Sequence, residues 1–123
     1  MKKLFQIVLV SSLSLLCFSC YYDDYSEEII IDIPDDQPIS FSSEIQPIFS
    51  KCTGCHGTNI SPDLREGNSY NQLVPNYVTA GDAEGSDLYN YLPGNGHHDI
   101  GFTLSGNEIA LIKAWIDQGA LDN

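Results

Sequence analysis

One short segment, residues 52–56 with the sequence C-T-G-C-H, constrains this chain more than any other feature of its sequence. Two thiols three positions apart, followed directly by an imidazole, form the attachment sequence of c-type haem. Each thiol can form a thioether to the porphyrin edge, and the histidine is then placed beneath the iron. We therefore predict one covalent haem c, attached at Cys52 and Cys55, with His56 as an iron ligand.

Two other uses of a C-x-x-C pair compete with this interpretation, namely half of a zinc site and a redox disulfide. Zinc needs two further ligands, and the only soft ligands downstream of Cys55 are His97 and His98, which have no matching C-x-x-C spacing. A redox pair usually lies at a strand-to-helix turn of a β-α-β unit, and the sequence shows no such pattern. Haem attachment is the preferred interpretation.

The N-terminus has the pattern of an export signal. Two lysines precede an apolar run at residues 4–18, which is shorter than the ~20 residues of a membrane-spanning helix. The run ends at residues 17–20, C-F-S-C, which resemble a bacterial lipobox. Residues 1–19 are predicted to be a lipoprotein signal peptide and Cys20 a lipid anchor; ordinary cleavage that leaves Cys20 as a thiol is the alternative. We expect an exported, membrane-anchored lipoprotein that faces the periplasm or the cell surface.

Composition separates a tether from a domain. Residues 20–40 are acidic and contain two prolines, so they are predicted to be a membrane tether, and residues 41–123 are predicted to be one small domain.

The chain has 17 acidic residues and only 5 Lys and Arg, a formal net charge of −12. Nucleic acid is excluded as a partner because its phosphates need the opposite charge. A redox partner protein with a basic docking patch fits this charge.

The local patterns of residues 41–123 are helical, and the predicted class is all-α. Ser43 and Gln46 have the spacing of a capping box for a helix that runs up to the C-x-x-C-H segment. Residues 70–73 are expected to form one short turn of helix. No segment shows the alternation of a convincing strand pair.

Two further helices are expected downstream. One begins after Ser86, a good N-cap, and ends at residues 93–94, a Pro-Gly pair. The last helix has a capping box at Ser105 and Glu108 and a C-terminal stop at Gly119. Its apolar stripe consists of Ile109, Ile112 and Ile116, widened by Leu111 and Trp115.

Three segments, in the right order, resemble small class I cytochrome c domains of the planctomycete/Bacteroidetes type. They are residues 41–57, with F-S-S-E-I-Q-P-I-F before C-T-G-C-H-G, residues 81–89, G-D-A-E-G-S-D-L-Y, and residues 104–120, which are similar to the closing helix of that group. The resemblance implies a small cytochrome c-type helical domain wrapped around one covalently attached haem. It also implies that Trp115 packs against the haem.

The chain departs from this family at the sixth iron ligand. Such domains usually place a Met-Pro-Pro sequence before the last helix, and the Met sulfur binds the iron. The only methionine here is Met1, which belongs to the predicted signal peptide, whereas the corresponding loop contains His97 and His98. We predict bis-histidine ligation by His56 and His98, with His97 as the competing ligand; an open site with both histidines on the surface is the alternative. Without a Met ligand the reduction potential should be lower.

The expected function is that of a monohaem one-electron carrier, in which the haem supplies the redox chemistry. The sequence shows no acid/base pair and no activated nucleophile, so we do not expect an enzyme. Two alternatives stay open. One is an open-site haem protein, either a gas sensor or a peroxidase-like protein, and the other is a haem-bearing accessory subunit of a surface complex.

Overall fold

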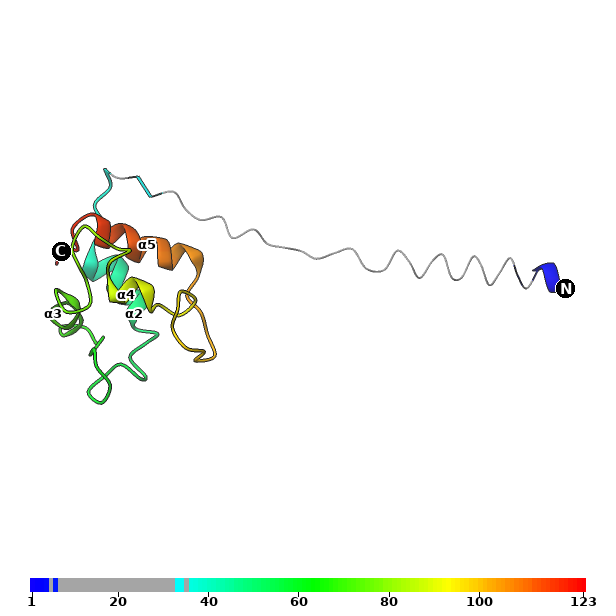
Figure 1. Ribbon diagram of the computed structural model, residues 1–123, viewed down its shortest axis with the longest axis horizontal. Helices are drawn as coiled ribbons and strands as arrows, with labels where there is room; N and C mark the ends of the chain where they lie inside the picture. The colour runs from blue at the N-terminus through cyan, green and yellow to red at the C-terminus, as the bar shows by residue number, and fades with distance from the viewer. Residues whose placement is uncertain (5, 7–32, 35) are drawn as a thin grey trace.

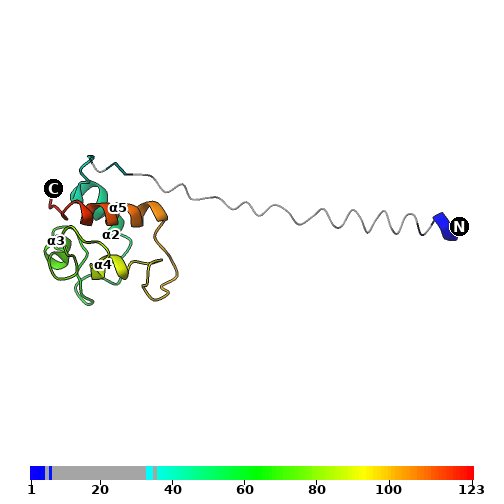
Figure 2. The ribbon, with the colours of Figure 1, turned by 45° about the horizontal axis from the view of Figure 1, so that its top comes forward.

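The computed structural model describes residues 1–4, 6, 33–34 and 36–123. Its helical elements in residues 36–123 are η1 (Phe41–Ile45), α2 (Gln46–Phe49), α3 (Ser69–Leu73), α4 (Asp87–Asn90) and α5 (Gly106–Asp117). Helix α5 contacts both η1 and α4 (Figures 1 and 2). Most of the predicted signal peptide, Cys20 and most of the predicted tether lie outside the described residues. Among the described helices, none combines the length and the apolar character needed to cross a membrane.

The prediction of an all-α, cytochrome c-type helical domain is wrong. Within residues 36–123 only two helical stretches are longer than five residues: η1 continued directly by α2, over residues 41–49, and α5, with 12 residues. Loops connect these elements, and the described residues form isolated β-bridges without a strand. Helices of four or five residues fix many dihedral angles for few hydrogen bonds, so glycines and prolines at short intervals stop them early. The domain is therefore rich in loops, and loops build its site.

The first helical segment begins earlier than its sequence pattern predicts. Ser40, not Ser43, is the N-cap: its hydroxyl accepts a hydrogen bond from the Ser43 amide at 3.3 Å. The Glu44 carboxylate accepts one from the Ser40 amide at 2.8 Å, which completes a capping arrangement one turn upstream. Gln46 is thereby free to bind elsewhere, and its side chain contacts the chain after the C-x-x-C-H segment.

Helix α4 is shorter than expected, and α3 and α5 agree with expectation. Ser86 is the N-cap residue of α4, but its hydroxyl accepts a bond from the Thr79 amide at 2.9 Å and donates one to the Asp82 carbonyl at 2.7 Å. For α5 the capping box of Ser105 and Glu108 is confirmed. Its end is confirmed as well, since the glycine at position 119 has a φ of +104°.

Trp115 is the centre of the core and is only 1% exposed. The Phe41 ring lies 5.2 Å from the rings of both Trp115 and Tyr70, measured between centroids. The Trp115 indole N–H donates to the Leu121 carbonyl at 2.9 Å, so the buried nitrogen is satisfied. Loop residues complete this core together with the helices; they include Ile39, Leu64, Val78, Ala83, Leu92, Leu104 and Ala120.

Candidate metal centre

The C-x-x-C-H segment forms a tight turn directly after α2. The Cys52 amide donates to the Phe49 carbonyl at 2.8 Å, and the amides of Cys55 and His56 both donate to the Cys52 carbonyl, at 3.1 and 2.8 Å. Cys52 and His56 are half-buried, whereas Cys55 is exposed. Both cysteines are free thiols. The turn therefore presents two thiols and one imidazole on a short, hydrogen-bonded piece of backbone.

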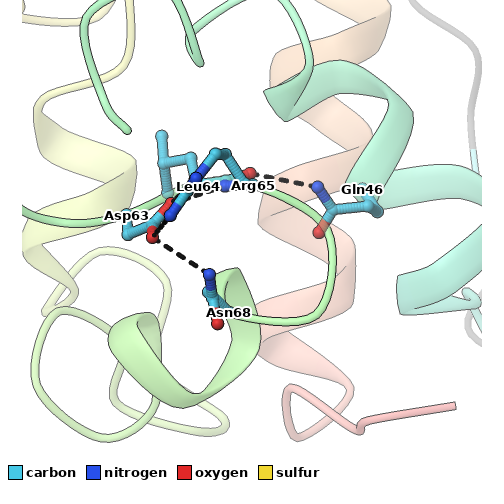
Figure 3. Close-up of polar contacts among 5 residues, drawn as sticks. All are labelled: Gln46, Asp63, Leu64, Arg65 and Asn68. Carbon is cyan, nitrogen blue, oxygen red and sulfur yellow. Dashed lines mark hydrogen bonds and ion pairs between the residues drawn. The ribbon is translucent and has the colours of Figure 1, made fainter. Parts of the chain in front are cut away.

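The chain that returns from this turn is fastened to α2 (Figure 3). The His56 carbonyl accepts a hydrogen bond from the Leu64 amide at 2.9 Å. The Leu64 carbonyl in turn accepts one from the Gln46 side-chain amide of α2 at 3.0 Å. Gln46 also accepts a hydrogen bond from the hydroxyl of Ser69, the first residue of α3. His56 is thus connected through the buried Leu64 to Gln46 of α2, and through Gln46 to Ser69 of α3.

A bidentate ion pair stiffens the same returning segment. The Arg65 guanidinium donates to both carboxylate oxygens of Asp63, at 2.9 and 2.7 Å, and the Asn68 side chain adds a third bond at 3.0 Å (Figure 3). The hydrogen bond from Arg65 lowers the pKa of Asp63 to about 2. Asp63 therefore stays ionised and keeps the turn closed over the whole neutral and mildly acidic range.

The second half of the site comes from the loop between α4 and α5, drawn yellow to orange in Figure 1. The Leu92 carbonyl accepts hydrogen bonds from the amides of Asn95, at 2.7 Å, and His97, at 3.3 Å. Leu92 itself is only 4% exposed, so it anchors the loop in the core. The Asn95 side chain donates to the Tyr89 carbonyl at 2.8 Å. These bonds fix the backbone at His97.

The two loops bring His97 next to His56. Their ring centroids are 6.3 Å apart, and the ring planes make an angle of 74°. The neighbouring ring of His98 stacks on His97, with centroids 4.4 Å apart and planes inclined by 28°. The His97 Nδ1 lies 2.8 Å from the His98 carbonyl oxygen. Nδ1 of His56 is buried and has no hydrogen-bond partner among the described residues.

An ion pair connects the backbone ahead of Cys52 with the helix that follows the second loop. The Lys51 ammonium contacts the Glu108 carboxylate, which also accepts the Ser105 amide in the capping box of α5. Burial works to raise the pKa of Glu108, but the hydrogen bonds from Lys51 and Ser105 outweigh it and hold this pKa below its ordinary value. The pair joins the start of the first half of the site to the helix that follows the second half.

The geometry disfavours the zinc and redox interpretations. Within the described residues, no group of three or more His, Cys, Asp and Glu side chains is placed to hold a metal ion, so the two cysteines and two histidines do not form a tetrahedral site. Burial raises the pKa of the Cys52 thiol. Reactive thiols of C-x-x-C redox motifs have a lowered pKa instead.

The distance between the two histidine rings can be compared with the distance between two imidazoles that share one metal ion. A metal–imidazole bond is ~2.0–2.1 Å long and the ring centre lies ~1.1 Å behind the bonded nitrogen, so two such rings have centres ~6.2–6.4 Å apart. The separation of the His56 and His97 centroids, 6.3 Å, matches this value. These two side chains alone do not form a metal site within the described residues. Nδ1 of His56 is a buried polar atom that has no hydrogen-bond partner in the same part of the chain.

The structure thus brings four of the predicted haem-binding residues into one region: Cys52, Cys55 and His56 on the turn, and His97 from the second loop. His98 is exposed and contacts His97. Cys20 lies outside the described residues. The supporting residues Lys51, Glu108 and Gln46 were not assigned to the site from the sequence. No local pattern could have identified them, since each acts on a partner at least 18 residues away.

A scan against protein-family models found no match to this chain. Searches of the curated proteins and of the solved structures found none either.

Proposed function

We propose that the protein is a lipid-anchored monohaem c-type cytochrome that carries single electrons. The observation that carries this proposal is the C-x-x-C-H turn together with a second imidazole, that of His97, whose ring centre lies 6.3 Å from that of His56. Two thiols for covalent attachment and two imidazoles for the iron form the complete set of protein groups that such a haem uses. The group itself, when bound, supplies reversible one-electron chemistry.

The residues of the chain have distinct tasks in this proposal. Cys52 and Cys55 would hold the haem covalently through their thiols. His56 and a histidine of the second loop would supply the imidazoles for its iron. With imidazoles in place of a Met sulfur, the reduction potential would lie below that of Met/His sites. Electron transfer then needs no catalytic side chain, and we propose no enzymatic activity.

The charge of the described domain supports a basic redox partner. Lys51, Arg65 and Lys113 are the only cationic side chains besides histidine in residues 36–123, and each is paired with a carboxylate, Glu108, Asp63 or Asp117. Most of the other acidic residues in this range are exposed, namely Asp36, Glu66, Asp82, Glu84, Asp87, Asp99 and Asp122. Such a surface attracts a protein with a basic docking patch, and the attraction weakens as salt screens it.

The localisation follows from the N-terminal residues alone. We propose export through the signal peptide at residues 1–19 and membrane attachment through Cys20, on the periplasmic or outer face. The acidic residues 20–40 then separate the domain from the lipid surface. Several acyl chains on one cysteine give durable attachment, since two or more chains suffice where one does not.

The proposal is tested by producing the full chain in a bacterial host that has a c-type haem attachment system. We expect haem to remain with the protein on a denaturing gel, and the Cys52→Ser/Cys55→Ser double variant to lose it. Cys20→Ser is the matched control: it should keep the haem and move from the membrane fraction to the soluble fraction. A folded but colourless protein would contradict the haem assignment, and rapid cyanide binding by the wild type would favour an open site over a carrier.

A further inference from the structure

We infer that His97, not His98, is the second axial ligand opposite His56, and that His98 serves through its main-chain carbonyl, which orients the His97 ring. This inference rests on the proposed haem attachment. It chooses between two neighbours that sequence spacing leaves equivalent, and it assigns a different task to each of them.

The first argument is position. The His97 ring centre lies 6.3 Å from that of His56, which is the separation expected for two imidazoles on opposite sides of one ion. Both rings belong to half-buried residues, whereas His98 is exposed. The ring contact of His98 is with His97, on which it stacks at 4.4 Å.

The second argument is the protonation pattern of the His97 ring. Its Nδ1 lies 2.8 Å from the His98 carbonyl oxygen, and a carbonyl oxygen can only accept a hydrogen bond. Nδ1 must therefore carry the proton, which leaves the lone pair of Nε2 available for a metal. An Nδ1–H bond to a backbone carbonyl is the arrangement that orients metal-ligating histidines in general. Because this acceptor belongs to the backbone, it persists when the side chain of residue 98 is replaced.

The third argument is the backbone that presents His97. Its amide donates to the carbonyl of the buried Leu92. The preceding Gly96 has a φ of +107°, and a Cβ at this position would lie 2.3 Å from the Asn90 carbonyl oxygen. The backbone on the N-terminal side of the His97 Cα is thus fixed, and at position 96 only glycine can adopt the required conformation.

The angle of 74° between the two rings gives the inference its own spectroscopic signature. Parallel imidazoles split the energies of the two iron dπ orbitals and give a rhombic, three-line electron paramagnetic resonance signal. Crossed imidazoles leave these orbitals nearly degenerate, so the low-spin ferric signal becomes strongly anisotropic, with a single large g value. This readout does not depend on activity or on a redox partner.

The test uses the full-length protein with its haem attached, in the wild type and in the His97→Ala and His98→Ala variants. We expect a low-spin, strongly anisotropic ferric signal in the wild type and in His98→Ala. His97→Ala should be high-spin, and added imidazole should restore its low-spin optical spectrum. That rescue shows that the variant is folded and has lost only a ligand.

Three results would overturn the inference. These are a low-spin His97→Ala protein, a high-spin His98→Ala protein, and a rhombic signal from parallel rings in the wild type. Each requires haem to be bound, so it differs from failure of the proposed function, in which haem never attaches to Cys52 and Cys55.

Discussion

The substitution Gly96→Ala should be among the most damaging single-methyl changes in the domain. Gly96 precedes His97 and has a φ of +107°, outside the left-handed region that other residues tolerate best. A Cβ there would lie 2.3 Å from the carbonyl oxygen of Asn90, the last residue of α4. That oxygen belongs to the backbone, so it cannot move aside as a flexible side chain could.

The expected loss has two parts. Holding a non-glycine residue in this conformation costs ~1–3 kcal/mol, and the overlap with the backbone adds ~1–3 kcal/mol of the kind seen on overpacking. The sum, ~2–6 kcal/mol, is a large share of the ~5–15 kcal/mol by which most domains are stable. For a domain of this size the corresponding fall in Tm is on the order of 10–50 °C.

Gly101→Ala is the matched control in the same loop. Gly101 also has a positive φ, +83°, but nothing lies within 4 Å of the position where its Cβ would be. It should lose only the conformational part, ~1–2 kcal/mol. Chemical denaturation of the full chain measures both variants under the same conditions. Equal losses for Gly96→Ala and Gly101→Ala would refute the steric reasoning and, with it, the fixed backbone at His97.

Three other perturbations test the supports of the site and the core. Lys51→Met and Glu108→Gln should each lower the unfolding free energy by ~1 kcal/mol or less, because the ion pair is partly exposed and Gln can keep the capping box. A double-mutant cycle should show coupling between the two substitutions. Additive losses would show that the pair is not formed. The hydrogen bond from Arg65 lowers the pKa of Asp63 to about 2, so its contribution is present above the unfolded value of ~4 and is lost as the pH falls toward 2. The stability difference between the wild type and Asp63→Asn should therefore shrink from pH 5 to pH 2 in urea titrations, and a constant difference would contradict this. Trp115→Ala should lower the unfolding free energy by ~3–5 kcal/mol, because the side chain is only 1% exposed and its N–H donates to the Leu121 carbonyl. A loss below ~1 kcal/mol, measured by calorimetry, would show that Trp115 is not the centre of the core.

The elements that could be predicted from the sequence are those whose determinants lie within a few residues of each other. The capping box of Ser105 and Glu108 and the glycine at position 119 define α5 without help from the rest of the chain. The turn at residues 52–56 is equally local, since its hydrogen bonds span at most four residues. The last helix and its caps were therefore correctly predicted, whereas the role of residues 52–56 as haem ligands stays a prediction.

The fold class could not be predicted, because competing partners decide the short helices. The Ser86 hydroxyl binds the Thr79 amide, seven residues upstream, and the resulting α4 has only four residues. The N-terminal helix is capped by Ser40, although Ser43 has an equally good local pattern. Helical periodicity alone takes no account of such competition, so it placed the start of the N-terminal helix too late and the end of α4 too far along the chain.

The position of the second imidazole was uncertain for the same reason. Residues 97 and 98 are chemically identical, and only the three-dimensional path of the loop distinguishes them. That path depends on the buried Leu92, whose carbonyl accepts the His97 amide, and on the close approach of Gly96 to Asn90. Spacing from the last helix carries no information about either contact.

A site made from two loops takes rigidity from the hydrogen bonds and ion pairs that hold those loops. Here one loop is tied to α2 through Gln46 and Leu64, and the other is tied to the core through Leu92. The ion pair between Lys51 and Glu108 joins the first loop, where it leaves α2, to α5, which follows the second loop. An electron carrier works best when its ligands move little between oxidation states, since each displaced group adds to the barrier. These hydrogen bonds and the ion pair therefore bear directly on the proposed function. Removing one of them should lower the rate of electron exchange even where the loss of unfolding free energy is small.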